Sequence, residues 1–127
     1  TIQTSTTPAL KSSLDSFANY VPAGGNPDYT FTNAAANSSF GFSPEGADTI
    51  ARFKDNGTSA CNTGSSETSG KCWDGLSTTP ASIAGSASSN HPSGTPVTVR
   101  FRAESGSSHI QTSGNYTATV TVTAVTL

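Results

Sequence analysis

The chain has 127 residues, of which 11% are charged and 32% are hydrophobic, and its formal net charge at pH 7 is -2. A chain of this length buries roughly two thirds of its unfolded surface, so residues 1–127 are predicted to form a single domain. The small net charge argues against a disordered chain, and six unclustered basic residues argue against nucleic acid as a partner. No apolar run is long enough to span a membrane.

The N-terminal half is predicted to form short strands. TIQTST, residues 1–6, is rich in β-branched residues, which favour strands. DYTFTN at residues 28–33 and SSFGFSP at residues 38–44 each place two aromatic residues on one face, as a half-buried strand does. In LKSSLDSFANYV, residues 10–21, the apolar residues recur at helical spacing, and one short helix is the alternative there.

Cys61 and Cys72 are the only cysteines and enclose a polar loop rich in Ser, Thr and Gly. Their spacing does not match a redox CxxC motif, and no second pair of Cys or His residues completes a zinc site. A disulfide would restrict the unfolded chain, and disulfides persist in oxidising compartments. We therefore predict a Cys61–Cys72 disulfide and an extracellular or cell-surface location. Triplets of the glycosylation type begin at Asn37, Asn56 and Asn115 and add only weak support, because a chain of this composition contains them by chance.

Trp73, the only tryptophan, follows Cys72 directly, and two interpretations of it remain open. An exposed indole would be a ligand platform on which a sugar ring stacks. A buried indole would instead be a core residue that closes one end of the fold, beneath the loop held by the disulfide.

The C-terminal region contains the two clearest strands. PVTVRFRAE places Val97, Val99, Phe101 and Ala103 on one face, and GNYTATVTVTAVTL alternates apolar residues with threonines over residues 116–124. After residue 124 the phase is ambiguous, because Val125 and Leu127 occupy the threonine face. Alternation with a period of two predicts half-buried strands. Many short strands separated by Gly, Pro and Asn turns are typical of an all-β protein, here an antiparallel β-sandwich, Ig-like or pilin-like, with long loops.

No catalytic, cofactor-binding or metal site is predicted. Carboxylates in loops usually face only solvent, so a glycosidase-type acid–base pair is not favoured. The carboxylates considered are Asp48, Asp55, Glu67, Asp74 and Glu104. Neither His91 nor His109 accompanies a nucleophile motif such as GxSxG. KDNG ends in the turn signal Asn56-Gly57 and lacks the alternating ligands of an EF-hand, which leaves only an irregular loop site for calcium.

Three stretches together resemble a group of secreted bacterial cell-surface proteins: FGFSPEG, CNTGSSETSGKCWDGLSTTP and VTVRFRAESGSSHIQTSGNYTATVTVTAV. The shared features are the Cys loop followed by W-x-G-L-S-T and a closing strand of the form G-x-Y-T-A-T-V-T-V-T. The ending is also broadly similar to spore-coat-U-like and pilin-type sandwich proteins. The resemblance covers roughly residues 1–126 and implies an extracellular β-protein rather than a reaction. The resembling proteins carry a further strand-forming segment before the position of TIQTSTTPAL, which implies an incomplete sheet in this chain.

Two functions follow as expectations. The first is a non-catalytic structural subunit that self-associates into a fibre or surface layer by β-strand donation, because the C-terminal strand has few of the charges and prolines that protect an exposed edge. The residues expected at exchange edges are Ile2, Thr4, Tyr116, Val120 and Val122. The alternative is a carbohydrate-binding or adhesive module that contacts glycans through Trp73 and nearby Tyr or Asn side chains. A complete monomeric sandwich is the alternative to strand exchange.

Overall fold

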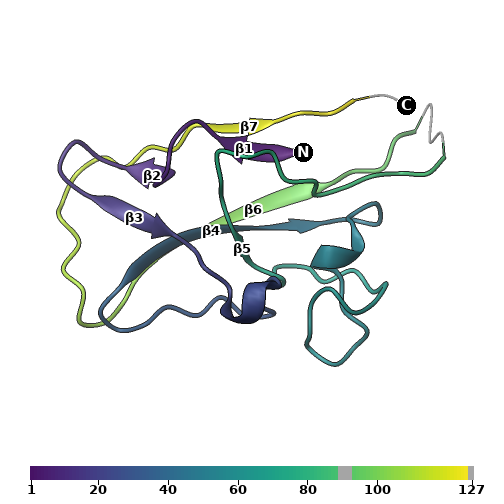
Figure 1. The fold of residues 1–127 in the computed structure, drawn as a ribbon, viewed down its shortest axis with the longest axis horizontal. Coiled ribbons are helices and arrows are strands. Elements are labelled where there is room, and N and C mark those ends of the chain that lie inside the picture. Colours follow the sequence, from purple (N-terminus) through teal and green to yellow (C-terminus); the bar gives the residue numbers. More distant parts are fainter. Residues whose placement is uncertain (89–92, 126–127) are drawn as a thin grey trace.

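The computed structural model describes residues 1–88 and 93–125 and has an all-β fold (Figure 1). Its strands are β1 (Ile2–Thr4), β2 (Leu10–Lys11), β3 (Ser16–Asn19), β4 (Ser38–Glu45), β5 (Asp74–Gly75), β6 (Thr98–Ser105) and β7 (Val120–Val122). Among these residues the only helical elements are two 3₁₀ turns, η1 (Ala23–Gly25) and η2 (Ala51–Phe53).

The strands form two sheets. β1 and β7 make a small antiparallel sheet, with Ile2 opposite Val122. The larger sheet has the order β2-β3-β4-β5, and β6 joins it on β4. β4 and β6 have eight residues each and pair antiparallel over their whole length, so they form the central ladder of the fold.

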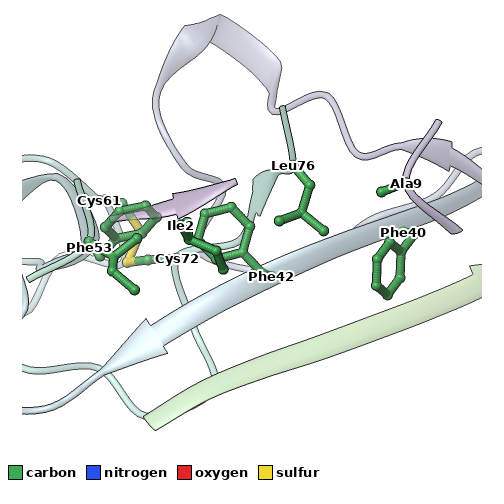
Figure 2. Close-up of a cluster of buried hydrophobic side chains, with 9 residues drawn as sticks. Ile2, Ala9, Phe40, Phe42, Phe53, Cys61, Cys72 and Leu76 are labelled. Carbon is green, nitrogen blue, oxygen red and sulfur yellow. A yellow bond between two sulfur atoms is a disulfide. The ribbon is translucent and has the colours of Figure 1, made fainter. Parts of the chain in front are cut away.

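The core lies between the two sheets. Ile2 of β1 belongs to the same buried cluster as Phe40 and Phe42 of β4. Figure 2 shows this cluster, with the sulfur atoms of the disulfide at one end beside Phe53 and with Phe40 near the other end. The large side chains of β4 therefore hold the two sheets together, and the disulfide extends the same core toward the Cys loop.

One pair of strands departs from the antiparallel arrangement predicted from the sequence, because β3 and β4 are parallel. Parallel neighbours need a crossover connection of a dozen or more residues. Residues 20–37 supply it, and the strand expected at residues 28–33 is replaced by an isolated bridge between Asp28 and Trp73. Phe31 is buried in a small aromatic cluster instead of lying on a strand face.

The helix considered for residues 10–21 is absent, and the segment is a β-hairpin. The Ser12 side chain bonds locally, accepting hydrogen bonds from the amides of Leu14 and Asp15 at 3.2 and 3.0 Å. Such local bonds between side chain and backbone compete with helix formation and favour turns. Leu10 then lies opposite Phe17 across the hairpin, while Leu14 at the turn is 79% exposed.

The C-terminal strand is shorter than its pattern predicted. The alternation covers residues 116–124, but among the described residues the strand is Val120–Val122 alone, with a bridge from Thr117 to Lys11 and further main-chain hydrogen bonds between Thr119 and Ser5 and between Thr123 and Thr1. The partners set this length, because β1 has three residues and β2 has two. Residues 126 and 127 lie outside the described residues.

Candidate functional site

β6 forms one edge of the larger sheet. The amide of Tyr20 donates to the carbonyl of Phe40 at 2.8 Å, so the Phe40 main chain faces β3 rather than β6. Phe40 lies opposite Ala103 in the β4–β6 register. Successive residues of a strand direct their N–H and C=O groups to opposite sides, so the main chains of Val99, Phe101 and Ala103 face away from β4. Among the described residues β6 pairs with β4 alone.

β7 has a similar free edge. The Thr1 amino group donates to the Thr123 carbonyl at 2.7 Å, and the Thr123 amide donates to the Thr1 carbonyl at 3.0 Å. Odd-numbered residues of this segment therefore face β1, and the main chains of Val120 and Val122 face the opposite side. No described strand pairs with β7 on that side.

A groove of about 900 Å³ is lined by residues 82–88, by residues 95–99 at the start of β6 and by residues 122–125 at the end of β7. In Figure 1, β1 lies between β7 and β6. Its apolar lining includes Val97, Val99, Val122, Val125 and Ile83. Val122 is 59% exposed and Val125 is 82% exposed, although both lie in a segment with strand alternation. The groove thus has exposed apolar side chains in its lining, and two of its residues, Val99 and Val122, belong to strands with one unpaired backbone edge.

Two of the exchange-edge residues predicted from the sequence do not lie at an edge. Ile2 and Thr4 are each 2% exposed, and their amides donate to the carbonyls of Ala81 and Ser77 at 2.8 and 2.9 Å. β1 therefore lies between β7 and residues 77–81. The contact with residues 77–81 is long-range, so no local pattern in TIQTST could have shown it.

Tyr116, also predicted at an exchange edge, instead forms hydrogen bonds within the loop at residues 111–116 and to Asp15. Its hydroxyl donates to the Thr112 carbonyl at 2.6 Å and lies 3.3 Å from Asp15 Oδ2, to which Gln111 Nε2 also donates at 2.7 Å. The Thr112 amide, which donates to the same carboxylate, contributes most to lowering the pKa of Asp15. Only Val120 and Val122 of the predicted edge residues lie on the free edge of β7.

The predicted disulfide between Cys61 and Cys72 is confirmed, and both residues are buried. Trp73 is 6% exposed, and its Nε1–H donates to the Gly70 carbonyl at 3.2 Å. Its ring packs edge-on against Phe31 at 5.4 Å between centroids. An indole enclosed in this way offers no face to a ligand, so the sugar-platform interpretation is wrong and Trp73 is a core residue.

Glu45, at the end of β4, ties the Cys loop to β6. Its carboxylate accepts hydrogen bonds from Arg100 Nε at 2.9 Å and from Arg100 Nη2 at 2.8 Å. From the Cys loop it accepts hydrogen bonds from the Ser69 hydroxyl at 2.8 Å and the Gly70 amide at 2.9 Å. The bonds from Arg100, and next that from Ser69, hold the pKa of Glu45 at about 2, below its ordinary value of 4.5. Glu45 is therefore charged at neutral pH, and its hydrogen bonds position both the loop and Arg100 on β6.

Replacing Glu45 by Gln is expected to remove a pH-dependent part of the free energy of unfolding. The pKa of Glu45 is about 2 in the fold and 4.5 ordinarily, so its stabilisation is complete above about pH 4.5 and is lost as pH falls through about 2. Urea unfolding across this interval should show a smaller loss of stability for Glu45→Gln than for the wild type. Glu67→Gln, in the exposed part of the same loop, is the matched control and should follow the wild type. Three identical pH profiles would contradict the assignment.

Three of the carboxylates considered as acid–base candidates, Asp55, Asp74 and Glu104, have structural partners. Asp74 pairs with Arg52 at 2.7 Å, and Glu104 pairs with Arg102 on the same strand. Asp55 is buried at the start of a turn. Asp74 and Glu104 are thus each held by a cation, and Asp55 by its own turn.

The two histidines are the remaining candidates. His109 Nδ1 lies 3.1 Å from the Ala36 carbonyl, and His91 lies outside the described residues. Within residues 1–88 and 93–125, no three His, Cys, Asp or Glu residues come together in a way that could hold a metal ion.

The sequence predicted β6 as a strand but did not identify it as an edge of the sheet. Its charged residues Arg100, Arg102 and Glu104 alternate with the apolar ones. Charged side chains on one face are a known property of edge strands, and they were the available signal. The order of strands, which determines that β6 is an edge, depends on contacts far apart in the chain.

No family model matches the chain, and no match is found among curated proteins or solved structures. In the described part of the chain no helix has the length and apolar character needed to cross a lipid bilayer. A function for the chain therefore has to be argued from its own groove and loop.

Proposed function

We propose that the protein is a non-catalytic extracellular structural subunit, a building block of a cell-surface layer or pilus-like filament that assembles by β-strand donation. The observations that carry this proposal are the unpaired backbone edges of β6 and β7 and the apolar groove to which Val99 and Val122 of these strands contribute. The disulfide supports the extracellular part, because disulfides persist in oxidising compartments.

An extended segment from another copy fits the chemistry of this groove. Its main chain would satisfy the unpaired N–H and C=O groups of the free edges, and every second side chain would enter the apolar lining. Val122 and Val125, which are 59% and 82% exposed and line the groove, are the side chains that such a segment would cover. Burial of apolar area of this kind is stabilising by about 25 cal/mol per Å².

The arrangement of charges supports the same proposal. Residues 105–127 contain no Asp, Glu, Lys or Arg, so nothing on β7 opposes the approach of a strand through charge. On β6 the charged side chains alternate with the apolar ones, and Arg100 is engaged with Glu45. Head-to-tail donation between copies does not close on itself, and it therefore produces a filament.

The carbohydrate-binding or adhesive alternative depended on an exposed Trp73 as its ligand platform. The indole is instead buried and hydrogen-bonded. We therefore do not propose glycan binding.

Val122→Asp is expected to abolish assembly without unfolding the subunit. The side chain is 59% exposed and lines the groove, so a carboxylate there repels an inserted apolar strand while costing the isolated subunit little. Native protein examined by light scattering and electron microscopy should form high-mass assemblies, and Val122→Asp should remain monomeric.

Thr121→Asp is the matched control, because Thr121 is the exposed neighbour on the opposite face of the same strand. It carries the same charge and should assemble like the wild type. A wild-type protein that stays monomeric at high concentration, or equal loss of assembly in both variants, would contradict strand donation through this groove.

A further inference from the structure

The turn that follows η2 holds a reactive pair of residues in an unusual setting. Asn56 is the only asparagine in the chain that is followed by glycine. Asn56 and Gly57 are both exposed, Gly57 has a φ of +89°, and a Cβ placed on it would meet no atom within 4 Å. The two residues therefore have room for a chemical rearrangement that a packed segment would prevent.

Asp55, just before this pair, is held firmly in place. It is 3% exposed, and it exchanges two main-chain hydrogen bonds with Ser66, at 3.2 and 2.9 Å. Gly64 packs so closely that a Cβ on it would lie 2.3 Å from the Asp55 carbonyl oxygen, so no other residue fits there. Both Ser66 and Gly64 belong to the loop closed by the disulfide, which thereby fixes the Asp55 backbone.

The Asp55 carboxylate faces the amide of Gly57. Gly57 N–H donates to Asp55 Oδ1 at 2.6 Å. The Gly57 nitrogen is also the atom that can attack the side-chain amide carbon of Asn56 to close a five-membered ring. A peptide nitrogen is a weak nucleophile, and a carboxylate in hydrogen-bond contact with its proton is placed to act as general base.

The amide that would be attacked is polarised by two donors. Asn56 Oδ1 accepts hydrogen bonds from the Thr58 hydroxyl at 2.6 Å and from the Thr58 amide at 3.2 Å. Donors directed at a carbonyl oxygen stabilise the negative charge that develops on it when a nucleophile adds to the carbon. Base, nucleophile, electrophile and oxyanion donors are thus all present within residues 55–58.

We propose that Asn56 is a self-modifying residue. The Gly57 nitrogen bonds to Asn56 Cγ while Asp55 accepts the nitrogen's proton, and the Cγ–Nδ2 bond then breaks. The Nδ2 group takes up that proton and leaves as ammonia. The five-membered succinimide that remains contains the former Asn56 Cγ and the Gly57 nitrogen. Water then opens the ring at either carbonyl and gives aspartate or isoaspartate, so the loop gains one negative charge.

The test follows residue 56 over time by peptide mass spectrometry. Folded, oxidised protein at neutral pH is compared with a synthetic peptide covering residues 52–60. The folded protein is expected to form succinimide, aspartate and isoaspartate at position 56 at least about tenfold faster than the peptide, because the reacting groups are already oriented. Equal or slower modification in the folded protein would overturn the proposal.

Two variants separate the roles of the neighbouring groups. Asp55→Ser keeps a hydrogen-bond acceptor but removes the base, and it should slow the reaction about a hundredfold. Thr58→Val removes the hydroxyl donor and should slow it about tenfold or more. Glu67→Ser and Thr63→Val remove another carboxylate and another threonine hydroxyl, both in the neighbouring Cys loop, and should leave the rate unchanged.

Circular dichroism establishes whether each variant folds. Thr58 is exposed, so Thr58→Val decides the matter even where Asp55→Ser does not fold. An unchanged rate in folded Thr58→Val, or in folded Asp55→Ser, would show that the turn does not catalyse its own modification.

Discussion

Trp73→Ala is expected to lower the free energy of unfolding by about 3–5 kcal/mol, as truncation of a buried aromatic side chain usually does. The indole is 6% exposed, packs edge-on against Phe31 and donates to the Gly70 carbonyl. Truncation would leave a cavity in the aromatic cluster and an unpaired carbonyl beside it. Chemical denaturation of the monomeric subunit, followed by circular dichroism, measures the loss.

Phe101→Ala is the matched control for this prediction. It also truncates an aromatic side chain, but Phe101 is 46% exposed, so the expected loss is about 1 kcal/mol. Similar small losses for both variants would show that the aromatic cluster around Trp73 contributes little, and would contradict its assignment as a core residue.

Reduction of the Cys61–Cys72 disulfide is expected to lower the free energy of unfolding by roughly 3 kcal/mol. The two cysteines are 11 residues apart, and a cross-link that closes a loop of about this size restricts the unfolded chain by that amount in the loop-closure model. Cys72 is 0% exposed and Cys61 is 5% exposed, so reduction leaves two small apolar groups inside the core. The folded contacts are therefore retained, and the effect lies mainly in the unfolded state.

Denaturation of the same protein with and without a phosphine reductant measures this difference. The double variant Cys61→Ala with Cys72→Ala controls for the reductant, because its stability should not change when reductant is added. A wild type whose unfolding midpoint is unaffected by complete reduction would contradict the prediction. Such a result would also show that the disulfide is not needed to hold the Cys loop, whose Ser66 bonds the Asp55 main chain, in place.

The strands β4 and β6 could be predicted from the sequence because their alternation has only one structural reading. In SSFGFSP and VTVRFRA, apolar residues occupy every second position and so lie on one face, and a strand is the only regular element with that period. The disulfide was predictable for a similar reason, since Cys61 and Cys72 have no other cysteine in the chain to pair with.

Residues 10–21 show where a local pattern supports two structures. Leu10, Leu14 and Phe17 recur at helical spacing, but Leu14 is 79% exposed at a turn while Leu10 and Phe17 face each other across a hairpin. The local bonds of Ser12 favour the turn, and the neighbouring strands stabilise the extended arms. Packing against the rest of the molecule therefore overrode the helical spacing.

The sequence by itself determined that this is an all-β protein with a disulfide-closed polar loop, because alternation and cysteine number are local properties. Only the tertiary structure decided which edges are free. Ile2 and Thr4 were predicted from the sequence to lie on an exposed edge strand, yet β1 is enclosed between β7 and residues 77–81. Val99 and Val122 lie far apart in the chain and meet across one groove. Strand order and register arise from contacts between distant segments, and no short-range pattern of side chains encodes them.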